Sequence, residues 1–241
     1  MLPQTVLEGR ATIIVPVGTI SKKLPVFYNP EMTLNRDVTV ALFRALGRRK
    51  LKGCDLLAGS GVRSIRLLKE AKGVFNHIVI NDANPLAVNA IKKHLRLNKI
   101  PAKTVTVTNL DANTLLATSS GYDYIDIDPF GTPNPFLDQS IQHLAREGIL
   151  GVTATDTAAL SGTSPKACQR KYWATPLRNY LMHDIGLRIL IRKCQLIGAQ
   201  HEKALVPVVT YAIKHYMRVI FHCDKGKQAV DNVLKRHAYL A

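Results

Sequence analysis

The sequence is poor in cysteine and in long apolar runs. Its four cysteines are scattered and form no C-x-x-C pair, which gives no basis for a local zinc site and predicts free, mostly buried thiols in a reducing compartment. No apolar run reaches the roughly 18 residues that a membrane-spanning helix needs. Residues 1–5 lack the basic-then-apolar pattern of a secretory signal. We therefore expect an intracellular, cytoplasmic protein (nuclear or mitochondrial in a eukaryote) that does not enter a membrane.

Acidic residues are also scarce. Thirty-three Lys and Arg stand against 17 Asp and Glu, a net charge of +16 over 241 residues. Such an excess attracts polyanions by counterion release and favours a nucleic-acid partner. A membrane surface is disfavoured because no strongly amphipathic basic helix lies beside a lipidation signal. Candidates for phosphate contacts, each of which is also a plausible solvated charge, are Lys22, Lys23, Arg48, Arg49, Lys50 and Lys52.

Buried strand patterns alternate with helix patterns through most of the chain. The predicted strands cover residues 54–58, 77–82, 104–107, 122–127 and 148–154, and the helices between them cover 62–71, 84–95 and 134–146. This alternation predicts an α/β fold with parallel strands and right-handed crossovers. After a helix over 185–197, strands at 206–211 and 216–222, joined near Lys214, would form an antiparallel edge.

The predicted fold class is α/β, a Rossmann-like sheet with an antiparallel edge and an N-terminal appendage. Prolines interrupt residues 1–50, so we expect that appendage to hold no long element and to fold over the ligand end of the sheet. The main domain would cover residues 51–224, and residues 225–241 would form a short C-terminal helical remnant.

Small or acidic residues follow four successive strands, at the carboxyl edge where such sheets bind ligands. They are Gly59-Ser60-Gly61, Asp82, Asp111 and Asp128. Position 64 is Ser rather than a third glycine, which disfavours a nicotinamide dinucleotide. Asp82 suits ribose hydroxyls, or alternatively caps the helix at Pro85. Asp111 and the Ala112 N–H suit an adenine ring. A nucleoside without a diphosphate fits these points, which indicates S-adenosylmethionine.

The segment Asp128-Pro129-Phe130-Gly131 can hold a planar base that carries an amino group. The Asp128 carboxylate and the Pro129 carbonyl can accept hydrogen bonds from an exocyclic amine, and Phe130 can stack on the base. An ordinary Asp-Pro turn beside a core Phe is the alternative. Asp126 and Asp128 could instead hold Mg²⁺, but no third carboxylate or histidine is close in sequence. We therefore predict no metal.

In combination, several segments identify a resemblance to the archaeal and eukaryotic tRNA (guanine-26-N2)-dimethyltransferases, the Trm1 family. They cover residues 26–32, 35–37, 60–66, 81–82, 111–113, 125–133, 152–158 and 168–172. The resemblance implies that the Rossmann-like sheet is of the class I methyltransferase type. It also implies two successive methyl transfers from S-adenosylmethionine to N2 of guanine 26 in tRNA, and a tRNA rather than a DNA partner. An adenine-N6 or other exocyclic-amine methyltransferase, and a catalytically silent RNA-binding module, are the alternatives. The sequence does not indicate protein partners.

The resemblance also implies roles for individual side chains. Asp128 would orient the guanine amine and take its proton, while Phe27 and Phe130 line the base pocket. The cofactor residues would be Arg36, Arg63, Arg66, Asp82, Asp111 and Ala112. A surface ion pair is the alternative for Arg63 and Arg66, and a phosphate contact is the alternative for Arg36.

The segment Arg170-Lys171-Tyr172-Trp173 mixes charge with aromatic rings, as RNA-binding surfaces do. We expect Arg170 and Lys171 to contact the substrate. Relatives continue into a C-terminal domain that helps to grip tRNA, so we expect this shorter chain to keep cofactor binding better than tRNA affinity.

Overall fold

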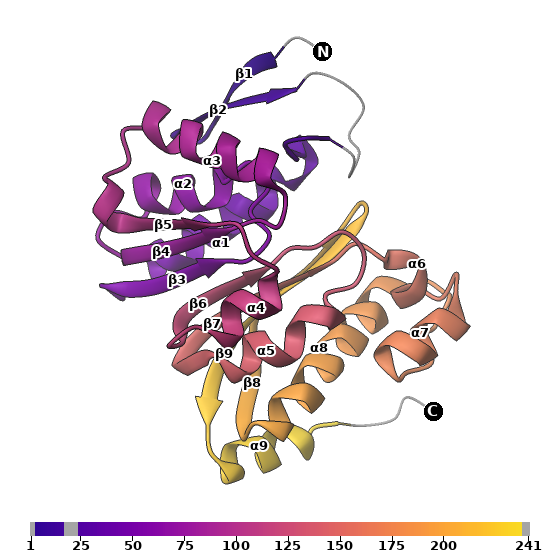
Figure 1. The fold of residues 1–241 in the computed structure, drawn as a ribbon. Coiled ribbons are helices and arrows are strands. Elements are labelled where there is room, and N and C mark those ends of the chain that lie inside the picture. Colours follow the sequence, from indigo (N-terminus) through magenta and orange to yellow (C-terminus); the bar gives the residue numbers. More distant parts are fainter. Residues whose placement is uncertain (1–2, 17–23, 238–241) are drawn as a thin grey trace. The chain divides into compact units, whose positions relative to one another are not determined.

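The computed structural model describes residues 3–16 and 24–237, so Lys22 and Lys23 lie outside the described residues. The chain divides into two compact units, Met1–Leu115 and Leu116–Ala241 (Figure 1). Each unit contributes strands in parallel pairs, and the alternation of strand and helix confirms the predicted α/β fold class. The boundaries of the proposed domains stay a prediction.

The first unit holds a parallel sheet in the order β5-β4-β3. Its strands are β3 (Leu51–Asp55), β4 (Phe75–Asn81) and β5 (Val105–Thr108), and its helices are η1 (Pro30–Met32), α1 (Thr33–Ala45), α2 (Val62–Glu70), α3 (Pro85–Leu97) and η2 (Ala102–Thr104). The short helix α4 (Ala112–Ala117) follows β5 and crosses the unit boundary.

An antiparallel hairpin, β1 (Pro3–Glu8) and β2 (Ala11–Pro16), lies over α2 and α3 (Figure 1). Two buried polar side chains hold it there, one in α3 and one at the C-cap of that helix. Asn98 Oδ1 accepts the Thr12 N–H at 2.9 Å, and His94 Nε2 lies 3.0 Å from both the N–H and the carbonyl oxygen of Ile14. The other ring nitrogen of His94 contacts the Ser60 carbonyl oxygen at 2.8 Å. One histidine therefore connects the hairpin to the glycine-containing loop.

The second unit has strands in the order β6-β7-β9-β8, with β6 and β7 parallel and β7, β9 and β8 antiparallel. The antiparallel edge is thus confirmed, and its turn contains Lys214 with φ +50°. The strands are β6 (Tyr122–Ile127), β7 (Leu144–Ala154), β8 (Lys203–Ile213) and β9 (Tyr216–Lys225). The helices are α5 (Asn134–Gln142), α6 (Thr157–Leu160), α7 (Pro165–Tyr172), α8 (Met182–Gln200) and α9 (Lys227–Leu234).

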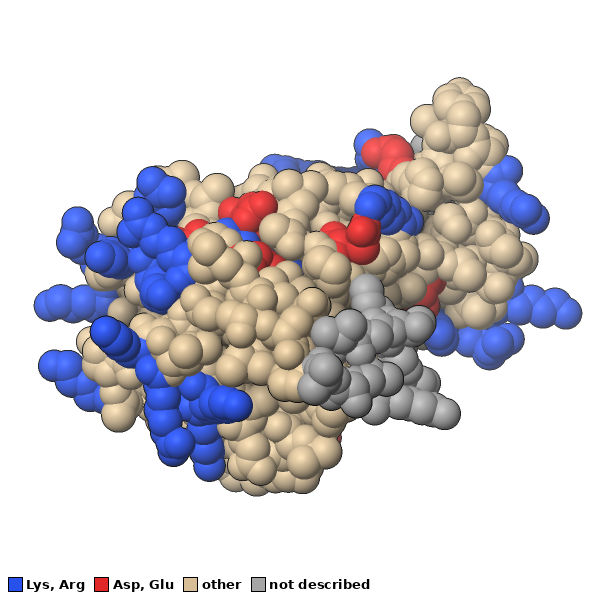
Figure 2. Space-filling model, turned by 90° about the horizontal axis from the view of Figure 1, so that it is seen from above, with Lys and Arg blue, Asp and Glu red and all other residues tan. Residues whose placement is uncertain are grey.

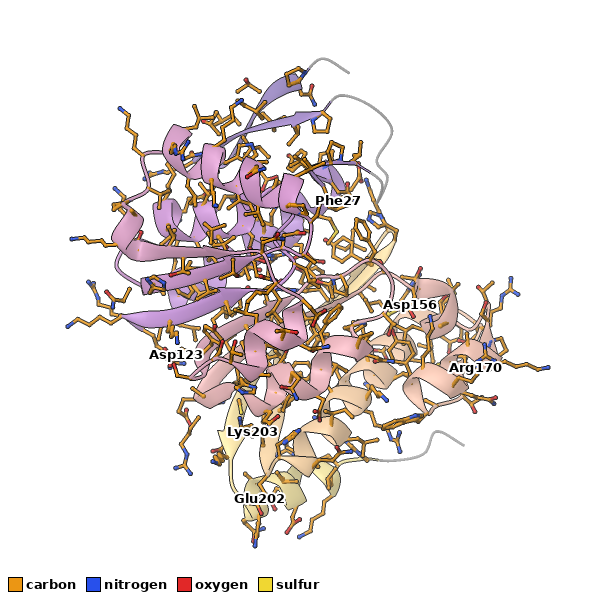
Figure 3. The ribbon with its side chains drawn as sticks, viewed as in Figure 1. Phe27, Asp123, Asp156, Arg170, Glu202 and Lys203 are labelled. Carbon is orange, nitrogen blue, oxygen red and sulfur yellow. The ribbon has the colours of Figure 1, made fainter. Side chains whose placement is uncertain are left out.

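Two expectations about element boundaries were wrong. Residues 1–50 contain a 13-residue helix, α1, although we expected no long element there. Helix α5 ends at Gln142 rather than near residue 146, because the buried Lys203 ammonium closes its C-terminus. Its Nζ donates to the carbonyl oxygens of Ile141 and Gln142, each at 2.8 Å, and of Leu144 at 2.6 Å (Figure 3). Strand β7 then begins directly at Leu144.

The four cysteines are free and buried, as predicted. Among the residues that the structure describes, no helix combines the length and the apolar character needed to cross a bilayer. The +16 charge is visible on the surface, where Lys and Arg side chains gather in groups on the face shown in Figure 2 and acidic side chains are few.

Candidate functional site

The loop after β3 meets the end of β4 at the carboxyl edge of the first unit's sheet. The Gly59 N–H donates to Asp82 Oδ2 over 2.8 Å, and Asp82 Oδ1 accepts the N–H of Asn84, also at 2.8 Å. Gly59 has φ +55°, and a Cβ at this position would lie 2.9 Å from the Phe27 carbonyl oxygen. The close approach therefore requires glycine. It also brings the segment that carries Phe27 against the predicted cofactor loop.

Asp82 has capacity left for a ligand. Its two backbone contacts occupy one acceptor position on each carboxylate oxygen, and each oxygen has a second lone pair. The side chain is partly exposed, and α3 is capped by Asn84, whose Oδ1 accepts the Leu86 N–H, rather than by Asp82. The arrangement fits an acceptor for ribose hydroxyls.

Asn81 was not predicted as a site residue, yet it joins the ends of three strands. The side chain is fully buried, and its Nδ2 donates to the carbonyl oxygens of Leu56 at 3.0 Å and Leu110 at 2.9 Å. Its Oδ1 accepts from the Thr108 hydroxyl at 2.8 Å and from the Leu110 N–H at 3.1 Å. Asn81 thereby fixes the loops that carry the predicted cofactor residues relative to one another.

Asp111 lies at the end of the third of these strands. Its Oδ1 accepts the N–H groups of Asn113 at 3.0 Å and Thr114 at 3.1 Å, which makes it the cap of α4. The side chain is exposed, whereas Ala112 is buried behind it. The cap uses one carboxylate oxygen and holds the side chain in a defined direction at the ligand edge.

The three predicted cofactor arginines are buried in the first unit, and each has polar partners there. Arg63 Nη1 donates to Asn35 Oδ1 at 2.8 Å. Arg36 binds the Glu8 carboxylate through Nε at 2.6 Å and Nη2 at 2.5 Å. Arg66 donates through all three nitrogens to carboxylates, which belong to Glu8, Asp37 and Glu70.

Glu8 is the centre of this ion network. Burial alone would raise the pKa of its carboxyl group, but the hydrogen bonds and charge of Arg36, together with hydrogen bonds from Arg66 and Tyr28, outweigh burial and lower that pKa to about 2. Glu8 ends β1, so the network attaches the hairpin to α1 and α2. For Arg66 these contacts favour a structural role, because a cofactor carboxylate would compete with three protein carboxylates already in place.

In the second unit, the predicted base-binding loop follows β6. Asp128 is partly exposed, Pro129 is buried, and Phe130 is 53 % exposed. The loop is tied to the end of β7 by reciprocal bonds: the Gly131 N–H donates to the Thr155 hydroxyl at 2.6 Å, and the Thr155 N–H donates to the Gly131 carbonyl at 2.9 Å. The Phe130 ring is therefore not part of the core, and its exposed face is accessible to a planar ligand.

Asp156 gives the loop a second support (Figure 3). The Tyr172 hydroxyl donates to Asp156 Oδ1 at 2.6 Å and lies 3.1 Å from the Thr132 hydroxyl of the loop. Burial, and then the charge of Asp156, raise the pKa of Tyr172 far above its ordinary value, so the phenol stays protonated as a donor. Lys171 Nζ completes the cluster with an ion pair to Asp156 Oδ2 at 3.1 Å.

The segment 170–173, which we expected to face RNA, therefore contains both buried and exposed side chains. Tyr172 is fully buried and serves the loop, whereas Arg170 and Trp173 are exposed. Trp173 lies under Lys193, whose Nζ is 2.8 Å from the ring centroid. Alternation of charged and aromatic residues predicted an RNA-binding surface but could not tell which aromatic ring turns inward.

The sequence also did not predict a buried ion pair at the end of β6. Arg218 of β9 donates to both oxygens of Asp126, at 3.2 and 2.5 Å, and to the Thr153 hydroxyl at 2.9 Å. Tyr124 also donates to Asp126, and neither member of the ion pair is exposed. Asp126 is thus committed to a structural pair two residues before Asp128. Among the described residues, no group of three or more His, Cys, Asp or Glu is arranged to hold a metal ion.

Comparison with known proteins gives consistent matches. A family model described as N2,N2-dimethylguanosine tRNA methyltransferase matches residues 9–241. The chain is 42% identical over 245 residues to the tRNA (guanine(26)-N(2)/guanine(27)-N(2))-dimethyltransferase of Aquifex aeolicus, and 39% identical over 241 residues to the tRNA (guanine(26)-N(2))-dimethyltransferase of Methanothermobacter thermautotrophicus. Each match covers 98% of this chain and 62% of the relative.

Among solved structures, Trm1 from Pyrococcus horikoshii in complex with S-adenosyl-L-methionine is similar, with a TM-score of 0.89 and 34% identity. The match covers 97% of this chain and 64% of that protein. The likeness confirms the predicted methyltransferase-type sheet. The chain spans a little under two thirds of the length of these relatives.

Proposed function

Because this chain belongs to the N2,N2-dimethylguanosine tRNA methyltransferase family, we propose that it uses S-adenosylmethionine to methylate N2 of guanine 26 in tRNA, first once and then a second time. The observation that carries this proposal is the Asp128–Phe130 loop, which presents a carboxylate and a half-exposed ring and is held by Thr155, Asp156 and Tyr172. As a tRNA-modifying enzyme, the protein would act inside the cell.

The first unit supplies residues that fit the cofactor. The Gly59 turn leaves no room for a side chain, Asp82 offers free acceptor positions, and Asp111 is exposed at the neighbouring strand end beside Ala112. We assign the ribose to Asp82 and the adenine to Asp111 and Ala112. Arg36 and Arg63 remain proposed contacts for the methionine part, and Arg66 is assigned to holding the hairpin. When bound, the cofactor supplies an electrophilic methyl group on a sulfonium.

The second unit supplies groups suited to the base. The Asp128 carboxylate and the Pro129 carbonyl would accept the two N–H bonds of the guanine amine, which directs the nitrogen lone pair toward the methyl donor. Phe130, and Phe27 of the first unit, would stack on or border the base. As the N–C bond forms and the C–S bond breaks, the amine becomes positively charged. Asp128 then takes a proton from the nitrogen and passes it to water.

The same groups can serve twice, because monomethylated N2 keeps one N–H for Asp128 and one lone pair for transfer. The target base in a folded tRNA must first leave its stack, and an exposed ring such as Phe130 offers a replacement stacking partner. We propose that Arg170 and Lys171 contact the RNA near that base. Lys171 also forms an ion pair with Asp156.

The proposal is tested with Asp128→Ala and Asp128→Asn in assays of methyl incorporation from labelled S-adenosylmethionine into unmodified tRNA. We expect each variant to lose at least roughly 100-fold in kcat, the usual contribution of a positioned base, while calorimetry shows unchanged cofactor affinity. Asp138→Ala, which removes an exposed carboxylate from α5 of the same unit, is the matched control. Activity retained in the Asp128 variants would refute the assigned role.

Nucleoside digestion of the wild-type product separates the proposed reaction from its alternatives. N2-methylguanosine followed by N2,N2-dimethylguanosine is the expected result. N6-methyladenosine in the product would instead indicate an adenine-specific methyltransferase. No methyl incorporation despite tRNA binding would indicate a catalytically silent RNA-binding module.

A further inference from the structure

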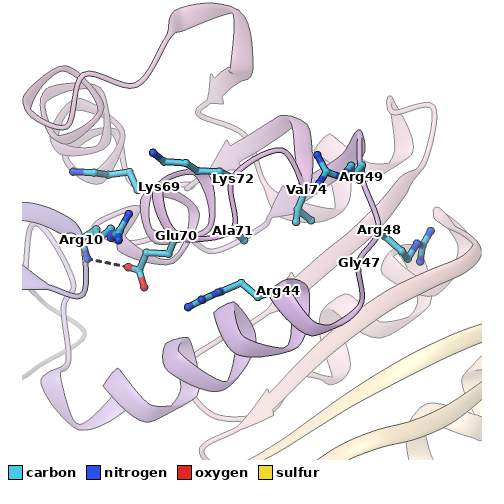
Figure 4. A pocket seen from close by; sticks show the side chains of 10 residues that line it. All are labelled: Arg10, Arg44, Gly47, Arg48, Arg49, Lys69, Glu70, Ala71, Lys72 and Val74. Atoms are coloured by element: carbon cyan, nitrogen blue, oxygen red, sulfur yellow. Dashed lines mark hydrogen bonds between the residues drawn. The ribbon is translucent and has the colours of Figure 1, made fainter.

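The opposite edge of the first unit's sheet, where β3 and β4 begin, carries a pocket of about 430 Å³ (Figure 4). Three segments form it: the hairpin turn with Arg10, the end of α1 with the loop after it, and the end of α2 with its loop. The cationic lining residues are Arg10, Arg44, Arg48, Arg49, Lys69 and Lys72. They are far apart in sequence, so only the fold brings them together.

This pocket has little negative charge to balance its cations. Glu70 is the one carboxylate that lines it within the described part of the chain, and that group is already bound by Arg66 Nε at 2.8 Å and by the Arg10 N–H at 3.0 Å. The hydrogen bonds and charge of Arg66 and the Arg10 N–H overcome burial and lower the pKa of Glu70, so it stays ionised within that pair.

The cations themselves are available to a ligand. Arg10, Arg44, Arg49 and Lys72 are exposed, and no ion pair among the described residues involves their side chains. Lys69 Nζ donates to Asn98 Oδ1 at 3.0 Å, which holds it at the rim. Uncompensated cations around a concave surface retain an anion with several charges much better than isolated surface lysines do.

Resting on the proposed function, we propose that this pocket is a contact site for the RNA phosphate backbone, separate from the base-binding loop and the cofactor edge. A strand of five to seven residues is about 17–23 Å long, so within the first unit the phosphates bound here would lie about that far from the cofactor edge. Such contacts contribute affinity and set the orientation of the RNA, and they carry no base specificity.

The test uses the triple variant Arg44→Ala, Arg49→Ala, Lys72→Ala. We expect the KM for tRNA to rise at least tenfold, since one phosphate contact in water is worth about fivefold. The slope of log affinity against log salt should become shallower by about two to three, given about 0.7 to 0.9 for each of the three contacts. The kcat at saturating tRNA and the affinity for S-adenosylmethionine should not change.

The matched control is Lys227→Ala, Lys235→Ala, Arg236→Ala, which removes the same charge from exposed positions in or just after α9 of the other unit. The inference is overturned if tRNA affinity is unchanged in the pocket variant, or if the control loses as much. It is also overturned if only thermal stability falls, which would mean that the cations serve the negative ends of α1 and α2. Loss of binding to anionic vesicles with unchanged tRNA affinity would overturn it in favour of a membrane.

Direct tRNA binding, measured by gel shift alongside turnover, separates this inference from the proposed function. If the wild-type chain binds tRNA through the pocket and methylates nothing, the proposed function fails and the inference holds. If it methylates guanine N2 and the pocket variant binds tRNA normally, the inference alone fails.

Discussion

The buried pair of Arg218 and Asp126 offers the sharpest test of how the second unit holds the proposed base-binding loop. The pair joins β9 to β6 across β7, where Arg218 also binds Thr153, and both side chains are fully buried. Gly151 leaves the space that the pair occupies, since a Cβ there would lie 2.7 Å from Asp126 Oδ2. Arg218→Met keeps most of the side-chain volume and removes the charge.

Removing one member of a buried ion pair typically costs about 3–5 kcal/mol, because the other charge remains in the core without compensation. For a chain of this size, about 2–4 °C of Tm corresponds to 1 kcal/mol, so we expect Arg218→Met to lower Tm by about 6–20 °C. The assay is thermal unfolding followed by circular dichroism at pH 7. A double variant with Asp126→Asn should regain part of the loss, because no charge is then left buried.

Arg188→Met is the matched control, since Arg188 pairs with Asp184 at 3.0 Å on the exposed surface of α8. Exposed i,i+4 pairs contribute about 0.3–0.5 kcal/mol, so its Tm should fall by no more than about 2 °C. If Arg218→Met also stays within about 3 °C of the wild type, the pair contributes no more than a surface contact and the reasoning fails.

Two further predictions concern the first unit. Gly59→Ala should lower S-adenosylmethionine affinity, measured by calorimetry, because its Cβ would meet the Phe27 carbonyl. Gly47→Ala has a similar positive φ but open space around it and should leave that affinity unchanged. The Glu8 carboxyl, with its pKa lowered from 4.5 to about 2, should contribute about 3 kcal/mol above pH 5 that is lost as pH falls toward 2. Urea unfolding of Glu8→Gln should lack this part of the pH dependence, and an unaltered profile would contradict the assignment.

The strands and the ligand edge were predictable because they depend on local pattern. Buried strands produce apolar runs, and the residue after each run is placed at the carboxyl edge by the parallel topology alone. Two apolar runs place Gly59 and Asp82 after neighbouring strands, and the parallel topology places both at the same edge of the sheet. The structure contains the resulting contact between the Gly59 N–H and the Asp82 carboxylate.

Helix α1 was not predictable on the same grounds. Its buried positions are Asn35, Arg36 and Thr39 followed by Val40 and Phe43, so the apolar face covers only the C-terminal half of the helix. Pro30, which suggested interruption, instead begins the 3₁₀ turn that leads into this helix, capped by Asn29. Apolar periodicity does not detect a helix whose buried side chains are largely polar.

The two buried ion networks explain why the partners of the predicted site residues could not be inferred from spacing. Glu8 meets Arg66 across 58 residues, and Asp126 meets Arg218 across 92. Burying such charges is expensive, and well-packed apolar residues would often give equal or greater stability. Ion networks do impose direction, because each hydrogen bond fixes an angle as well as a distance. Both networks lie next to segments whose geometry the proposed chemistry requires. The Glu8 network binds Tyr28, adjacent to Phe27, and the Asp126 pair holds β6, which ends at Ile127, one residue before Asp128. We therefore propose that these ion networks are present in place of apolar packing because they position the site.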